Sequence, residues 1–181
     1  MTVLAEKINN REFAMTAEIV PPVAASTGPL LAEAEHLRGL VDAINITDGA
    51  GATTTMSSLA AAAILSAAGF EPVLQVTCRD RNRIALTADL IGAAAQGSCN
   101  LLVLMGDDPA KGDQPEAKAV FDFDSRQLIQ LARSLRDDAS LPSGKPLNDP
   151  PAFFIGAADM PLDPPADWKP DALQSLSLIH I

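Results

Sequence analysis

The 181-residue chain is poor in cysteine, histidine and basic residues, and it contains no long uninterrupted apolar run. Its two cysteines, Cys78 and Cys99, fit neither a metal-ligand spacing nor a disulfide framework. The formal net charge of −10 leaves no general basic surface for phosphates, so we expect no nucleic-acid partner. No apolar stretch is as long as a membrane span, and the first residues lack a signal-peptide pattern. We therefore expect no membrane partner and a cytoplasmic protein.

The composition is that of a globular domain, with 48% hydrophobic and 20% charged residues. The length is sufficient for one domain with a sizeable core. The last six residues, LSLIHI, carry no charge and no helix cap, and they look like the translated end of a sequencing adaptor. We therefore expect residues 1–175 to form the domain and residues 176–181 to be a non-native tail.

Short apolar segments alternate with helix-like segments along the whole chain, and they are apolar on both faces, as in a parallel sheet covered by helices. Two α/β architectures fit this alternation: an open, doubly wound sheet, and a (β/α)8 TIM barrel truncated to about its first five units. Periodicity does not decide between them. The expected strands cover residues 13–20, 41–47, 71–78, 99–106 and 151–158, and the expected helices cover 28–39, 56–69, 82–97 and 125–138, with a fifth helix beginning at 167.

Polar residues stand at the carboxyl ends of the expected strands, where parallel α/β folds place their chemistry. Glu18 reads either as a general acid or as a rim carboxylate paired with an arginine. Asp107, in the sequence GDDP, reads either as a ligand for a substrate or cationic intermediate, or as a turn residue. Asp108 precedes a proline and fits the turn. The arginine-rich loop 77–83 reads as a solvated charge run or as a phosphate contact.

Five segments follow one another in a specific order: AEIVPP near the start, INITDGA after the second expected strand, LQVTCRDRNR after the third, LVLMGDDPAKGD after the fourth, and FDFDS before the fourth helix. Over about residues 13–174 this set resembles the flavin-dependent methylenetetrahydrofolate reductase family. The resemblance implies a (β/α)8 barrel that carries FAD. It also implies hydride transfer from NADH or NADPH, through FAD, to 5,10-methylenetetrahydrofolate, which gives 5-methyltetrahydrofolate.

The resemblance also assigns roles to residues. Glu18 occupies the position of the acidic catalyst that helps protonate the folate nitrogen and opens the ring to the iminium that accepts hydride. Asp107 matches an aspartate near the pterin and the flavin, where a carboxylate stabilises the iminium charge. The implied flavin site further includes Thr47, Gln75 (where many members carry a histidine), Ala157 and Ala158.

The chain departs from the family pattern at two positions. Met105 stands where well-studied members carry an arginine that reaches the flavin phosphates, so Arg79, Arg81 or Lys111 become the candidates for that contact. Ala158 stands about where other members have a tyrosine.

The strands that complete the family's barrel are missing from the sequence, so we expect an amino-terminal fragment. A parallel barrel without three of its strands leaves open edges, and we expect this fragment to fold poorly and to hold FAD weakly. The family branch leaves open a homo-oligomer and a methyltransferase domain fused in the full-length parent. The alternative function is a folate- or flavin-binding module that serves a methyltransferase without reductase turnover.

Overall fold

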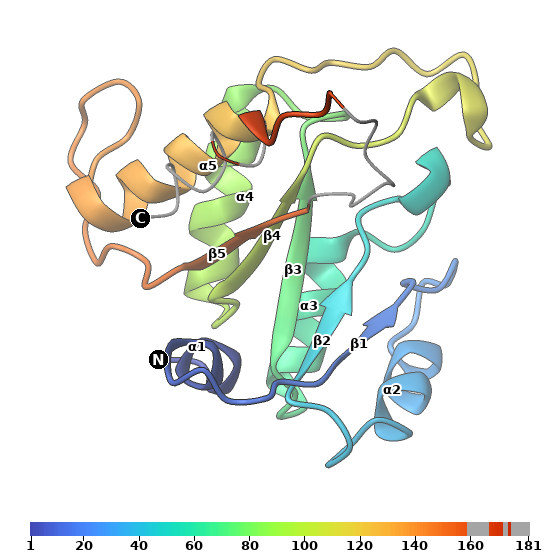
Figure 1. Ribbon diagram of the computed structural model, residues 1–181. Coiled ribbons are helices and arrows are strands. Elements are labelled where there is room, and N and C mark those ends of the chain that lie inside the picture. The colour runs from blue at the N-terminus through green and yellow to red at the C-terminus, as the bar shows by residue number, and fades with distance from the viewer. Residues whose placement is uncertain (159–166, 172–173, 175–181) are drawn as a thin grey trace.

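The computed structural model describes residues 1–158, 167–171 and 174. Its centre is a sheet of five parallel strands that lie in the order of the sequence, β1-β2-β3-β4-β5 (Figure 1). The strands are β1 (Thr16–Ile19), β2 (Ala43–Ile46), β3 (Pro72–Thr77), β4 (Asn100–Leu104) and β5 (Phe154–Ala157). Each lies inside the segment that the sequence predicted and is shorter than it.

Helices connect the successive strands and all pack on one face of the sheet. The helix α2 contacts α3, α3 contacts α4, and α4 contacts α5, so the helices follow the order of the strands. Figure 1 shows α3 and α4 behind β3 and β4. Their bounds are α2 (Gly28–Glu35), α3 (Ser58–Ala67), α4 (Arg83–Ala95) and α5 (Ser125–Arg133), the last continued by a π-helical turn at Ser134–Asp138.

This winding decides between the two predicted architectures. A flavodoxin-like doubly wound sheet has the strand order 2-1-3-4-5 and helices on both faces. Here the strand order is sequential and the helices α2 to α5 share one face, which is the winding of a (β/α)8 barrel. The predicted α/β alternation is confirmed, and the doubly wound alternative is wrong for the described residues.

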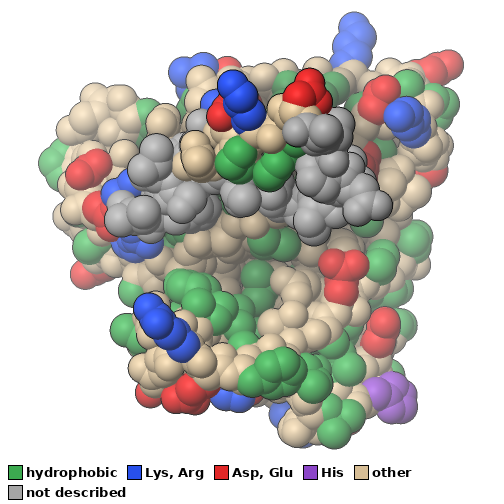
Figure 2. Space-filling view, viewed as in Figure 1, with side chains coloured by type: hydrophobic (Ala, Val, Ile, Leu, Met, Phe, Trp, Pro, Cys, Tyr) green, Lys and Arg blue, Asp and Glu red, His purple; other side chains and the backbone are tan. Residues whose placement is uncertain are grey.

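The two faces of the sheet differ in chemistry because successive side chains of a strand point to opposite sides. The face toward the helices carries Ile44, Ile46, Leu74 and Val76, which are buried in the two large hydrophobic clusters. The opposite face carries polar groups at its carboxyl half, Glu18 among them. In the space-filling view, hydrophobic side chains are visible over the middle and lower parts of this second face (Figure 2).

A short helix that the sequence analysis missed, α1 (Val3–Asn9), closes the amino end of the second face. Leu4 packs there with Ala43 of β2 and Val73 of β3. Glu71 fixes the start of α1, because its carboxylate accepts hydrogen bonds from the backbone amides of Val3 at 2.7 Å and Leu4 at 2.9 Å. A seven-residue helix is too short to be stable alone, so these tertiary contacts explain its presence.

Two predictions fall largely outside the described residues: most of the fifth helix from residue 167, and the tail 176–181. Within the described part of the chain, no helix combines the length and apolar character needed to cross a bilayer.

Candidate functional site

Glu18 and Gln75 meet on the sheet face that the helices α2 to α5 leave uncovered. Glu18 of β1 is level with Asn45 of β2 and Val73 of β3, and Gln75 lies one step further along β3 on the same face. The Gln75 Nε2 donates a hydrogen bond to the Glu18 Oε2 at 3.0 Å, across the intervening strand β2. Gln75 is 6% exposed, whereas Glu18 is exposed. The pair therefore joins a fixed amide to a carboxylate that a ligand can reach.

Thr47 follows β2 and reaches the level of Gln75. Its backbone amide donates to the carbonyl of Ile19 at 3.2 Å, which continues the parallel ladder by one residue. The Thr47 Oγ1 is buried and has no hydrogen-bond partner among the described residues. Buried hydroxyls are almost always hydrogen-bonded to protein, water or a ligand, so this atom is available to a polar group from outside the described residues. Three neighbouring strands thus carry a cluster of polar side chains, formed by Glu18, Thr47 and Gln75.

Asp48 holds together the carboxyl ends of β2 and β3. Its Oδ2 accepts hydrogen bonds from the backbone amide of Thr77 at 2.8 Å and from the Thr77 hydroxyl at 2.9 Å. Its Oδ1 accepts from the Ser58 hydroxyl, at the start of α3, at 3.0 Å. Arg81 forms an ion pair with the same carboxylate and a second one with Asp89 at 3.1 Å. Asp48 therefore fixes the strand ends next to Thr47 and Gln75.

Asp107, the second predicted catalytic residue, lies in the loop after β4. Its Oδ2 accepts a hydrogen bond at 2.8 Å from the amide of Gly51, which belongs to the 3-10 turn η1 (Ala50–Ala52) after β2. Asp108 caps the next 3-10 turn, η2 (Pro109–Lys111), by accepting from the amide of Ala110 at 3.0 Å, as the turn prediction required. Asp107 thus joins two loops at the carboxyl ends of the strands. Among the described residues, Asp107 and Glu18 share no hydrogen-bond partner.

The same two loops are fastened further along. Asp113 accepts hydrogen bonds from the backbone amide of Thr54 at 2.9 Å and from its hydroxyl at 3.3 Å. Gly112 packs directly on the backbone of Ala52, and a Cβ at this position would overlap the Ala52 carbonyl. Asp107, Gly112 and Asp113 therefore dock the loop after β4 on the loop after β2.

Replacing Gly112 with alanine should lower the free energy of unfolding by about 1–3 kcal/mol, because one backbone must move away from the other. Urea denaturation of the two proteins measures this change. Gly92→Ala in α4 is the matched control: a Cβ there has open space and replaces a helical glycine, so it should stabilise by about 0.5–1 kcal/mol. Equal stability of Gly112→Ala and the wild type would contradict the close loop contact.

Two arginines after β3, the buried Arg79 and the half-buried Arg81, are paired with carboxylates of the protein. Arg79 is 5% exposed, forms a bidentate pair with Asp80 at 2.7 Å, and donates to the Gly49 carbonyl at 2.9 Å. The Asp80 hydrogen bond raises the pKa of Arg79, and the charges of Asp48 and Asp107 add to this effect.

Lys111 is exposed and forms no ion pair with any described residue. Of the three candidates for a phosphate contact, Lys111 is the one with a free charge.

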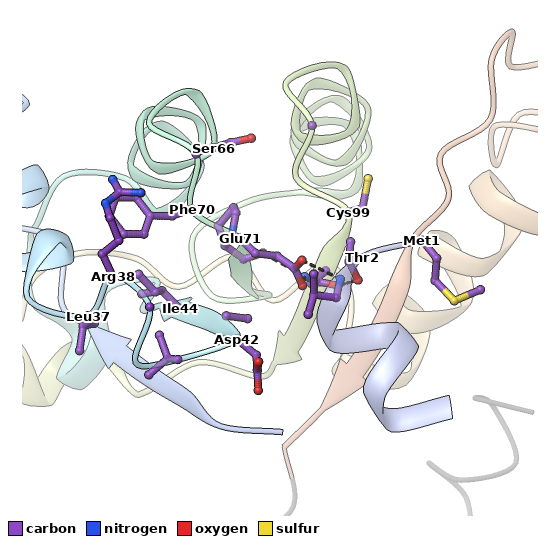
Figure 3. Close-up of a pocket in the computed structure, with 18 residues that line it drawn as sticks. Met1, Thr2, Leu37, Arg38, Asp42, Ile44, Ser66, Phe70, Glu71 and Cys99 are labelled. Carbon is purple, nitrogen blue, oxygen red and sulfur yellow. Dashed lines mark hydrogen bonds between the residues drawn. The ribbon is translucent and has the colours of Figure 1, made fainter. Parts of the chain in front are cut away.

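Two cavities of similar size lie at opposite ends of the sheet. One, of about 510 Å³, lies among the loops at the carboxyl ends and is lined by Asp48, Arg79 and Arg81, whereas Glu18 and Asp107 do not line it. The other, of about 540 Å³, lies at the amino ends. Figure 3 shows that Glu71 points across this second cavity toward Thr2 at the start of α1. Because the amino-end face of such folds serves stability, we assign this cavity no catalytic role.

The other positions singled out in the sequence lie at the ends of β3, β4 and β5. Ala157 packs against the helix-side core, so its side chain faces away from Glu18 and only its backbone can reach a ligand on the Glu18 face. Ala158 is exposed after the end of β5, and Met105 is 44% exposed after β4. Burial raises the pKa of the Cys78 thiol to about 11, which disfavours the reactive thiolate. No metal-binding cluster of acidic, histidine or cysteine side chains occurs in the described ranges.

The residues at the strand ends were predicted from the sequence, but the hydrogen bonds and packing contacts that join them were not. The hydrogen bond from Gln75 to Glu18 joins residues 57 positions apart. The sequence contained one indication of the central role of Asp48. This carboxylate stands between a buried strand and a loop that leads to a helix capped by a serine. The Gly112 contact had no signal in the sequence beyond the glycine itself.

The family model described as methylenetetrahydrofolate reductase matches residues 3–174, which is nearly the whole chain. The search of curated proteins gave no significant match. The chain therefore belongs to the methylenetetrahydrofolate reductase family, whose members are oxidoreductases of folate metabolism.

Proposed function

We propose that this protein performs the FAD-dependent reduction of 5,10-methylenetetrahydrofolate to 5-methyltetrahydrofolate, with NADH or NADPH as the hydride donor. The observation that carries this proposal is the cluster of polar side chains formed by Glu18, Thr47 and Gln75 on the uncovered face of the sheet. It places an accessible carboxylate beside a buried, unpaired hydroxyl at the carboxyl ends of parallel strands. This is the end at which barrels of this winding carry out their chemistry.

The described residues fit a flavin. The unpaired Thr47 Oγ1 is available as donor and acceptor for a polar atom of the ring. The Gln75 amide nitrogen is engaged by Glu18, and the backbone of Ala158 adds peptide groups for the flavin beyond β5. When bound, the flavin supplies the hydride chemistry that no side chain provides. Lys111, with its free charge, is the proposed contact for the flavin phosphates, in place of the arginine that Met105 replaces.

Glu18 is the proposed proton donor to the folate nitrogen. Its carboxyl is exposed on the sheet face, so a bound pterin can approach it, and one of its oxygens is already held by Gln75. Proton transfer from a positioned acid typically accelerates such a step by about 10²–10⁴-fold. As the methylene bridge opens, the protonated nitrogen leaves as a neutral amine and the positive charge passes to the iminium on the other nitrogen, which makes a nearby negative charge favourable.

Asp107 is the proposed source of that negative charge. One of its oxygens is fixed by the amide of Gly51 at 2.8 Å, so the carboxylate has a defined position at the strand ends. A carboxylate that is fixed before the reaction stabilises a developing cation without reorganisation. In this proposal Asp107 orients and stabilises the pterin, and Glu18 delivers the proton.

We further propose that additional strand–helix units complete the barrel around this site. Within the described residues, β1 and β5 each pair with one neighbour, and Val20 at the end of β1 is 51% exposed. Parallel sheets with uncovered edges and faces are uncommon in stable proteins. FAD titration into residues 1–181 alone is expected to show weak binding; a stoichiometric yellow complex would contradict this expectation.

The function is tested on the complete product of the reading frame that encodes these residues. The protein is loaded with FAD and mixed anaerobically with NADH or NADPH, and the flavin absorbance near 450 nm is followed. We expect bleaching with at least one nicotinamide. A protein that binds FAD or folate but is not bleached by either nicotinamide would instead be the binding module of the alternative function.

A further inference from the structure

The side-chain amide of Gln75 is hydrogen-bonded to Glu18. Its side chain is largely buried, and its amide reaches across β2 to the carboxylate on β1. The amide of Asn45, which is level with Glu18 on β2, instead donates to the Thr16 hydroxyl at 3.2 Å. Among the described residues, Gln75 is therefore the side chain that donates a hydrogen bond to Glu18.

The geometry of this bond distinguishes the two oxygens of Glu18. The amide nitrogen is a pure donor, so the oxygen that it contacts acts as an acceptor. In a protonated carboxyl, the carbonyl oxygen is the better acceptor and the other oxygen carries the proton. With Oε2 occupied by Gln75, the transferable proton is held at Oε1, the oxygen that remains open on the exposed side chain.

We propose that Gln75 is a positioning residue that selects Oε1 of Glu18 as the oxygen that delivers the proton to the folate nitrogen. This inference rests on the proposed function, in which Glu18 is the general acid. It assigns Gln75 a role that a flavin contact alone does not require. A residue that acts only through Glu18 should affect the folate step and leave the nicotinamide step unchanged.

The kinetic test compares Gln75→Met, which keeps most of the side-chain volume but removes the donor, with the wild type in the full-length protein. We expect the rate of flavin reoxidation by methylenetetrahydrofolate to fall by up to about tenfold, the size of one ordinary hydrogen bond. Flavin reduction by nicotinamide should change less than about twofold. In a Glu18→Gln background, Gln75→Met should have no further effect, because residues that act as a unit are non-additive.

The matched control is Gln96→Met, which removes an exposed amide that donates to the Gly92 carbonyl at 3.2 Å on α4, far along the chain from the site. This variant should match the wild type in both half-reactions. Additive effects of Gln75→Met and Glu18→Gln would overturn the inference. So would a Gln75→Met protein that loses the nicotinamide step as much as the folate step.

A second readout does not depend on turnover. In the ¹⁵N-glutamine-labelled protein, Glu18→Ala should shift the side-chain amide resonances of Gln75, assigned by their loss in Gln75→Met, and leave those of Gln96 in place. Unshifted Gln75 resonances would overturn the inference whatever the kinetics show. If the amide shifts but the wild type fails to reoxidise its flavin with folate, the proposed function is wrong, and the positioning role of Gln75 in proton delivery is wrong as well.

Discussion

Replacing Glu18 with glutamine should lower the rate of folate reduction by about 10²–10⁴-fold, the usual contribution of a general acid. Glutamine keeps the size of the side chain and a carbonyl oxygen that can accept the hydrogen bond from Gln75, which spans 3.0 Å in the wild type. It carries no transferable proton. Reduction of the flavin by nicotinamide requires no proton from Glu18, so its rate should stay close to that of the wild type. Anaerobic stopped-flow measurements of the two half-reactions separate these effects.

Glu33→Gln is the control for this experiment. Glu33 is an exposed glutamate on α2, so its replacement changes the net charge equally without touching the site. Both half-reactions of the control should match the wild type. If Glu18→Gln retains both half-reactions at full rate, Glu18 is not the acid; if it loses both, the carboxylate serves flavin binding instead.

Replacing Asp48 with alanine should have the largest effect on stability, a loss of about 3 kcal/mol, the lower end of the range for removing one member of a buried ion pair. The side chains of Asp48 and Arg81 are 11% and 18% exposed, so the pair is mostly shielded from water. The substitution also leaves the Thr77 and Ser58 hydroxyls without their acceptor. Arg81 retains its ion pair with Asp89, which keeps the loss at the lower end.

Asp89→Ala is the matched control, because Asp89 binds the same arginine but is 32% exposed. Asp89→Ala should lower the free energy of unfolding by less than about 1 kcal/mol, as is usual when an exposed ion pair is removed. Asp48→Asn should fall between the two, since an amide oxygen still accepts from Ser58 or Thr77. Chemical denaturation of all three variants gives the ranking, and equal losses for Asp48→Ala and Asp89→Ala would contradict the central position of Asp48.

The sequence predicted the alternation of strands and helices because each strand is a short apolar run ended by polar or glycine-containing segments. The starts of two helices were also predictable, since Asn82 and Asp124 are strong N-caps and both accept hydrogen bonds from the first turn. The sheet order was not predictable from periodicity, because α/β alternation is the same in singly and doubly wound sheets.

The candidate site was predictable as a list of residues but not as a set of contacts. Strand ends could be located, so Glu18, Thr47 and Gln75 were found one by one. That Gln75 reaches Glu18 across β2 depends on the register of three strands, which tertiary pairing sets. The helix α1 was missed for a similar reason: besides its Thr2 N-cap, it is held by Glu71, 67 residues away from Leu4.

The central claim is that the carboxylate and amide on this sheet face present a protonating site to a folate bound beside a flavin. It is tested most directly by one single-turnover measurement. The full-length protein, with its FAD reduced photochemically in the absence of nicotinamide, is mixed anaerobically with 5,10-methylenetetrahydrofolate. We predict that the flavin absorbance returns and that one equivalent of 5-methyltetrahydrofolate forms per flavin. A flavin that stays reduced in the presence of saturating folate would contradict the account.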